Sequence, residues 1–144
     1  MYTLRQAVAA DYEFLYHLHV ATMRPYIEAT WGWVETWQRE HFERKWEPTR
    51  NRIIQVNGID AGVLVTEWHP DEFYLALIEI LPVYQGRGVG TAVIHDLIQQ
   101  AAEQHLPLSL HVLKSNTPAR HLYERLGFHI VAEEDVRYKM MRMT

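Results

Sequence analysis

Three glycines alternate with other residues near the middle of the chain, at Gly86, Gly88 and Gly90. Glycine reaches backbone angles that strain other residues, and its lack of a side chain lets a ligand approach the backbone closely. Successive N–H groups in such a turn can point at one anion. A helical pattern begins within the run, and the N-terminus of a helix favours negative charge. The run therefore predicts a phosphate-binding turn.

Other glycine-rich phosphate loops fit this run poorly. A nucleotide P-loop requires Gly-x-x-x-x-Gly-Lys followed by Ser or Thr, and the run contains no lysine. A dinucleotide-binding turn requires Gly-x-Gly-x-x-Gly and an acidic residue at the end of the next strand, where this chain has Leu113 and Lys114. A purely structural role, in which the glycines only shape a tight connection, stays open.

One carboxylate interrupts an apolar row shortly before the glycines. Residues 73–81 place apolar side chains on both alternating faces except at Glu79, which is the pattern of a central strand buried on both sides. Burial would disfavour the charged form of Glu79 and suit it to accept a proton near neutral pH. The alternative is a carboxylate that backbone donors hold or that turns to solvent.

The rest of the chain supplies the elements that position these residues. We expect strands at 2–6, 52–56, 59–68, 73–81, 108–113, 128–132 and 136–141, and helices at 11–23, 34–46, 89–105 and 118–126, with a loop at 24–33. This order predicts an α/β fold with a mixed, mostly antiparallel twisted sheet of about seven strands, flanked by about four helices. The length of 144 residues fits a single domain, 1–144.

Composition and charge narrow the function classes. The formal net charge is −4 without a Lys/Arg cluster, which disfavours a nucleic-acid partner. No stretch approaches the ~20 apolar residues of a membrane span and no signal-peptide core is present, so we expect a cytoplasmic protein without a membrane partner. The absence of cysteine excludes a thiolate metal site, and no pair of the 9 histidines has ligand spacing, so we expect no metal.

The glycine run also carries a specific resemblance. Residues 85–90, Gln-Gly-Arg-Gly-Val-Gly, resemble the Gln/Arg-x-x-Gly-x-Gly/Ala signature of the GCN5-related N-acetyltransferase (GNAT) superfamily, and residues 116–128 resemble its second block. The resemblance implies an acyltransferase that moves the acetyl group of acetyl-CoA to a primary amine by direct attack in a ternary complex. The alternative on the same fold is a non-catalytic acyl-CoA sensor or interaction module.

The resemblance also implies where acetyl-CoA would bind. Its pyrophosphate would lie on the glycine turn, and its pantetheine arm along the strand end, where Pro82 interrupts the ladder and splays the sheet at its central parallel pair. Asn116 is expected at the pantetheine or acetyl end, and it is equally suited to cap the following helix. The expected cofactor-binding residues are Leu81, Val83, Gln85, Gly86, Arg87, Gly88, Val89, Gly90, Thr91 and Asn116.

Three catalytic roles follow for the transfer. A lysine-like amine with a pKa near ~10.4 must lose a proton before it attacks, and Glu79 is the expected base, directly or through water. The resemblance makes the Leu81 N–H the expected donor to the thioester carbonyl oxygen. It matches Tyr123 to the family's general acid for the departing thiolate, although an aromatic residue in this helix stripe is also a common core residue.

The acceptor site is expected near the first two helices, because in this superfamily they and their connection usually wall it. That segment contains Tyr26, Trp31 and Trp33 beside carboxylates, which suits a cationic amine through cation-π contacts and charge attraction. We therefore expect a small amine, an amino acid or a peptide or protein amine as acceptor. The same tryptophans also suit a core or a homodimer surface.

Overall fold

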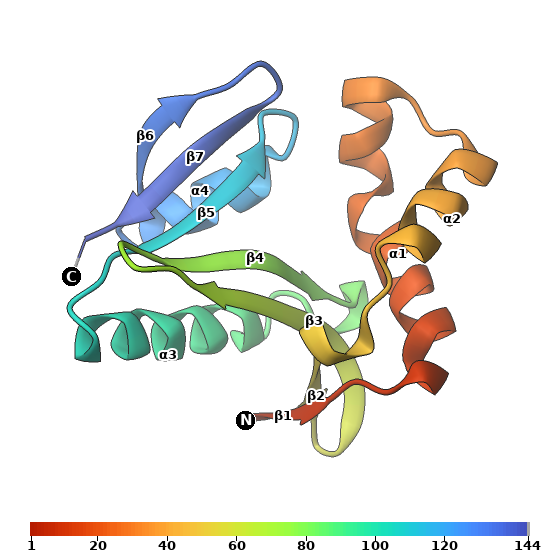
Figure 1. The fold of residues 1–144 in the computed structure, drawn as a ribbon, viewed down its shortest axis with the longest axis horizontal. Coiled ribbons are helices and arrows are strands. Elements are labelled where there is room, and N and C mark those ends of the chain that lie inside the picture. The colour runs from red at the N-terminus through yellow and green to blue at the C-terminus, as the bar shows by residue number, and fades with distance from the viewer. Residues whose placement is uncertain (144) are drawn as a thin grey trace. The chain divides into compact units, whose positions relative to one another are not determined.

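A computed structural model describes residues 1–143 and confirms the predicted order of strands and helices (Figure 1). The strands are β1 (Tyr2–Gln6), β2 (Arg52–Val56), β3 (Ile59–Trp68), β4 (Phe73–Ile80), β5 (Leu108–Leu113), β6 (His129–Glu133) and β7 (Arg137–Arg142). The helices are α1 (Tyr12–Trp31), α2 (Glu35–Arg44), α3 (Val89–Glu103) and α4 (Thr117–Arg125).

The strands form the mixed sheet that the sequence predicts. Its seven strands follow the order β1-β2-β3-β4-β5-β7-β6. The β4–β5 pair is parallel, whereas the β1–β2, β2–β3, β5–β7 and β6–β7 pairs are antiparallel. The register of the parallel pair runs from Phe73↔Leu108 to Leu75↔Leu110, so the later part of β4, which carries Glu79, lies outside this ladder.

The chain divides into two compact units. Unit 1 comprises Met1–Val65 and Leu77–Val89, and unit 2 comprises Thr66–Ala76 and the chain from Gly90 onward. Each unit has its own buried side chains. That residues 1–144 form a single domain stays a prediction.

The core of unit 1 lies where α1 meets the strands. Leu15 and Leu18 of α1 are buried together with Ile53 of β2 and Val63 of β3. The helical period and the strand alternation place these side chains on facing surfaces. Full burial of a side chain of this size contributes roughly 1.5–3 kcal/mol. This packing fixes α1, and with it His19, the residue after Leu18, against the strands.

Helix α1 is longer than the sequence predicted. It runs through Pro25 to Trp31, so the expected end at Met23 and the expected loop at 24–33 are wrong. Proline inside a helix costs about 3 kcal/mol because it removes one N–H bond. Burial of Ile27 beyond it offsets part of that cost, and Gly32, at φ 81°, then ends the helix. Despite the 20 residues of α1, no helix within residues 1–143 is long and apolar enough to cross a membrane.

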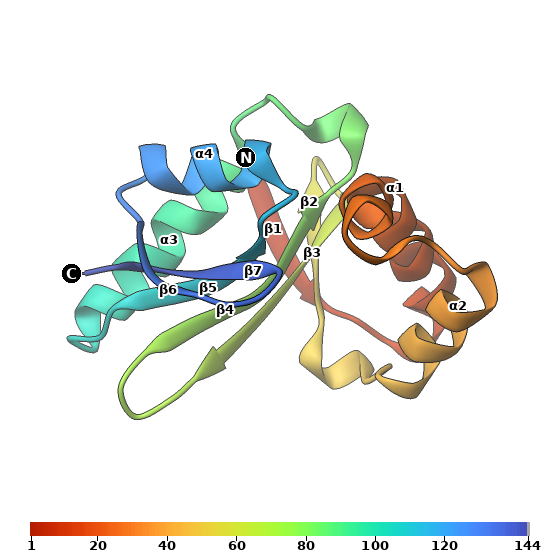
Figure 2. The same ribbon diagram turned by 90° about the horizontal axis from the view of Figure 1, so that it is seen from above.

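Unit 2 places both of its helices on one face of its strands. Figure 2 shows α3 and α4 on the same side of β5, β7 and β6. Leu108, Leu110 and Val112 of β5 are buried with the apolar residues of these helices. Because side chains alternate along a strand, Ser109 and His111 lie on the opposite face.

Candidate active site

Glu79 is buried near the end of β4, as the apolar row predicts. Its side chain is 2% exposed, and its Oε2 lies 3.1 Å from Nδ1 of His19 on α1. The imidazole in turn lies beside Trp33 and Phe42, with ring centroids 6.3 Å and 5.8 Å away. A buried carboxylate requires a polar partner, and here that partner is a group that can itself take up or release a proton.

The sequence did not predict the role of His19. In the sequence His19 suggested only a metal ligand, and its spacing from His17 argued against one. It lies three and four residues after the buried Tyr16 and Leu15, and this spacing is a local signal that His19 points toward the buried side of α1. Its partner Glu79 is 60 residues away, so packing of α1 on the sheet brings the two together.

Gly62 allows β3 to approach β4 closely at Glu79. A Cβ atom at Gly62 would collide with the carbonyl oxygen of Glu79 and would lie 3.0 Å from Cδ1 of Ile80. Any side chain at this position would therefore displace the strand segment that carries Glu79. The glycine is a second positioning feature that the sequence pattern did not reveal.

The backbone of Leu81 is already hydrogen-bonded within the protein. Its N–H donates to the carbonyl oxygen of Ala61 at 2.8 Å, and its own carbonyl accepts from the N–H of Tyr84 at 2.8 Å. This contact contradicts the expectation that the Leu81 N–H is free to bind a thioester oxygen. Successive N–H groups of a strand point to opposite edges, so the N–H of Ile80 points away from Ala61 and is the better candidate donor.

The backbone angles of the glycine turn require glycine at two of its three glycine positions. Gly86 and Gly88 have φ angles of 73° and 82°, which residues with a side chain rarely adopt. Gly90 lies in the first turn of α3, where φ is not positive. A Cβ atom at any of the three would meet no described atom within 4 Å. The shape of the turn thus explains two glycines, and close approach of a ligand to the start of the helix would explain the third.

Side chains around the turn hold its shape. The Gln85 amide donates from Nε2 to the carbonyl oxygen of Ile80 at 2.8 Å, and the Arg87 guanidinium lies over the Tyr84 ring at 5.6 Å. Val83 is 63% exposed within the short 3-10 helix Pro82–Tyr84. The remaining predicted cofactor residues of this segment, Val89 and Thr91, lie in the first turn of α3.

Two predicted site residues lie on or next to α4 in unit 2. Asn116 caps the helix, because its Oδ1 accepts from the N–H of Ala119 at 3.3 Å. Tyr123 is 9% exposed, and this burial raises its pKa to about 12. The hydroxyl therefore stays protonated near neutral pH and can donate a proton. Its ring also packs near Phe128, so it contributes to the core as well.

The residues expected to contact the acceptor differ in their exposure and in their contacts with other side chains. Trp33 is the most constrained, since its Nε1 donates to Glu35 at 2.9 Å and the Arg24 guanidinium lies 5.2 Å from its ring centroid. Trp31 is 64% exposed at the end of α1, and Tyr26 is half-buried on the same helix. A cationic acceptor at Trp33 would therefore compete with the chain's own arginine.

A second chain of proton-bearing groups lies in unit 2. The Tyr74 hydroxyl and Nδ1 of His111 are 2.6 Å apart, and Nε2 of His111 is 2.9 Å from Oε2 of Glu134. An imidazole that a carboxylate orients is a common arrangement for a general base. The sequence did not predict this group, although the polar alternation of Ser109 and His111 along β5 was a usable signal.

Comparison with known proteins connects these features to one family. The family model described as "Acetyltransferase (GNAT) family" matches residues 12–128. The [Ribosomal protein bS18]-alanine N-acetyltransferase of Haemophilus influenzae is 34% identical over 139 residues, which cover 95% of this chain and 86% of that protein.

Solved structures agree with that match. The ribosomal-protein-S18-alanine N-acetyltransferase from Escherichia coli superposes with a TM-score of 0.63 at 26% identity, over 98% of this chain and 90% of that chain. A PaiA N-acetyltransferase from Thermoplasma acidophilum, solved in complex with coenzyme A, has a TM-score of 0.81 at 11% identity, over 100% and 99% of the two chains. At that identity the second structure shows that the fold is shared.

Proposed function

The chain belongs to the GNAT family and is an N-acetyltransferase that moves the acetyl group of acetyl-CoA to an amine, and we propose that this amine is the N-terminal α-amine of a polypeptide. The observation that carries the proposal is the 34% identity to the [Ribosomal protein bS18]-alanine N-acetyltransferase of Haemophilus influenzae. The name of that enzyme gives an alanine of a protein as its acceptor, and the match extends over 95% of this chain. The match spans 139 of 144 residues, so it includes most or all of α1 and α2, where the acceptor is expected, and is not confined to the cofactor blocks.

An α-amine suits the groups that we assign to the reaction. Its pKa of about 7.7–8.0 is lower than that of a lysine amine, so a carboxylate base of modest strength can remove its proton. We assign this step to Glu79. The Ile80 N–H is our candidate donor to the oxyanion that forms on attack, and Tyr123 is our candidate donor of the proton that the departing thiolate takes up.

The glycine turn is our candidate seat for the pyrophosphate of acetyl-CoA. Gly90 supports this assignment, because neither backbone strain nor packing requires glycine there. The backbone N–H groups of the turn and the positive end of α3 favour an anion. In a calorimetric titration with acetyl-CoA, the Gly88→Glu variant should lose binding, because the new carboxylate repels phosphate. The φ of 82° at position 88 also disfavours any residue with a side chain.

The acceptor is tested with matched peptides and mass spectrometry. One peptide begins with a free alanine and contains an internal lysine, the second has the same sequence with a blocked N-terminus, and a small diamine is the third acceptor. We expect acetyl on the α-amine of the first peptide and none on the second. Acetylation of the lysine in both peptides, or of the diamine alone, would contradict an α-amine acceptor while leaving acetyl transfer intact.

A further inference from the structure

The two members of the Glu79–His19 pair differ in their access to solvent. The Glu79 side chain is 2% exposed, whereas that of His19 is 22% exposed. A base that takes a proton from each acceptor must return that proton to water before the next turnover. Because Glu79 itself is closed to solvent, the imidazole 3.1 Å away offers the path.

We propose that His19 passes the proton from Glu79 to water and holds the Glu79 carboxylate in place; the proposal rests on the proposed function, in which Glu79 is the base. An N–H bond of the acceptor breaks as an O–H bond forms on Glu79. At rest the Nδ1–H of His19 donates to the Glu79 carboxylate. Once Glu79 is protonated, exchange with water moves the ring proton from Nδ1 to Nε2. Glu79 then gives its proton to Nδ1 while the proton on Nε2 leaves to water, so that Glu79 is again a carboxylate and the Nδ1–H of neutral His19 again donates to it.

Aromatic neighbours orient the imidazole for this role. The rings of Trp33 and Phe42 lie at interplanar angles of 34° and 36° to that of His19. Trp33 is itself fixed by its hydrogen bond to Glu35, which also accepts from the Tyr16 hydroxyl at 2.8 Å. These aromatic side chains therefore restrict the orientation of the imidazole and keep its Nδ1 directed toward Glu79. His19 acts through Glu79 and is a positioning residue.

The charged groups around His19 are compatible with a proton passing through it. Glu79 contacts His19 from β4. Among the described residues, His41 of α2 is another titratable group that interacts with His19, and this interaction is electrostatic. Burial lowers the pKa of His41, and the positive charges of Lys45, Arg44 and His19 lower it further. His41 is therefore neutral near pH 7 and places no fixed positive charge beside the ring.

Two substitutions at His19 separate proton transfer from simple packing. His19→Asn keeps a hydrogen-bond donor near the position of Nδ1 but cannot carry a proton onward, and His19→Ala removes both functions. We expect both to lower kcat for acetylation of the alanine peptide about tenfold to a hundredfold, with KM for the peptide within about twofold of wild type. Free imidazole should restore part of the kcat of His19→Ala, because the partly exposed site can admit it.

His17→Ala is the matched control on the same helix. The His17 side chain is 73% exposed and its Nδ1 lies 2.7 Å from the carbonyl oxygen of Glu13, away from Glu79. We expect its kcat to equal that of wild type, and thermal melting should show that all three variants are folded. Wild-type kcat in His19→Asn, or failure of imidazole to restore folded His19→Ala, would overturn the proposal while the proposed function stands. Wild-type kcat in Glu79→Gln would instead remove the base on which both depend.

Discussion

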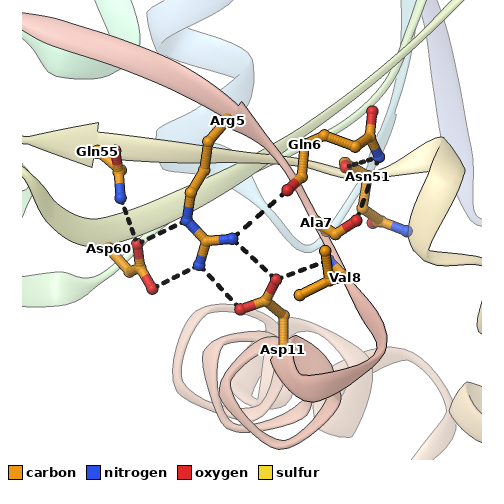
Figure 3. A network of polar contacts seen from close by, with 8 residues as sticks. All are labelled: Arg5, Gln6, Ala7, Val8, Asp11, Asn51, Gln55 and Asp60. Atoms are coloured by element: carbon orange, nitrogen blue, oxygen red, sulfur yellow. Dashed lines mark hydrogen bonds and ion pairs between the residues drawn. The ribbon is translucent and has the colours of Figure 1, made fainter.

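Among the described residues, two of the polar contacts between the α1 segment and the strands of unit 1 differ in how their charges are balanced. Arg5 of β1 donates to Asp11, just before α1, at 2.8 Å and 2.9 Å, and to Asp60 of β3 at 2.8 Å and 3.3 Å (Figure 3). The hydrogen bonds that Arg5 donates to Asp11 and Asp60 raise its pKa, so it stays charged. Glu79 meets an imidazole instead, and an imidazole can change its charge near neutral pH.

This difference is the basis on which we assign a structural role to the Arg5 contact and a chemical role to the Glu79–His19 contact. Hydrogen bonds from Arg5 lower the pKa of both Asp11 and Asp60, which locks all three groups in their charged forms. Groups that cannot exchange protons near pH 7 can hold strands and helices together but cannot act as acid or base. The Glu79–His19 pair joins a carboxylate to an imidazole, which is the kind of side chain that can in general take up or release a proton near neutral pH.

The Tyr74–His111–Glu134 chain of unit 2 shares one property with each of these two contacts. A hydrogen bond from Arg137 lowers the pKa of Glu134, so this carboxylate is fixed in its charged form like those beside Arg5. It can still orient His111, which makes His111 the rival candidate for the base. The comparison of Glu79 with His111 is therefore the one that experiments should decide first.

The largest effect is expected from Glu79→Gln. The substitution keeps the size of the side chain but cannot accept a proton, so kcat for peptide acetylation should fall about 100- to 1000-fold with little change in melting temperature. His111→Asn is the matched comparison and should retain most of the activity. A large loss in His111→Asn with normal activity in Glu79→Gln would move the base to unit 2.

Tyr123→Phe should lower kcat by about a hundredfold, because the thiolate then leaves without a proton from the hydroxyl. Stability should change little, since the ring that packs near Phe128 is kept. Tyr74→Phe removes the hydroxyl beside His111 and provides the control. If it reduced kcat more than Tyr123→Phe did, the general-acid assignment would have to be abandoned.

Arg5→Met should destabilise the protein without impairing the chemistry. It leaves Asp11 and Asp60 without their shared cation, and the free energy of unfolding should fall by roughly 2 kcal/mol, as for lost hydrogen bonds to charged groups. Urea unfolding gives this value, and kcat measured below the unfolding range should match wild type. A fall in kcat comparable with that of Glu79→Gln would show that the Arg5 contact is not purely structural.

The smallest effect is the acid dependence of stability. Arg5 lowers the folded-state pKa of Asp11 and Asp60 below the ordinary value of 3.8, so their contribution is present above that pH and disappears as the pH falls through the lowered values. Between pH 5 and pH 2, wild type should therefore lose about 1 kcal/mol more stability than Arg5→Met, because solvent screening keeps the contribution small. Parallel curves for the two proteins would show that these aspartates titrate normally.

Local sequence patterns predicted most of the fold and part of the candidate site. The hairpin at Asn57-Gly58, the apolar row around Glu79 and the glycine turn each depend on neighbours in the sequence, and the structure has all three where expected. The error at Pro25 has a different origin, since a local rule against proline in helices was outweighed by packing on the far side. The contact that occupies the Leu81 N–H also depends on a partner strand that the local pattern does not specify.

The sequence by itself determined the order of the elements, the sheet type, the glycine turn and the family, because periodicity, turn chemistry and motif spacing act over a few residues. Only the tertiary structure decided which polar groups meet. His19 and Glu79 are 60 residues apart, and Arg5 and Asp60 are 55 apart. The packing of α1 and the register of the strands select these partners, because they fix the distance between two groups and their burial together.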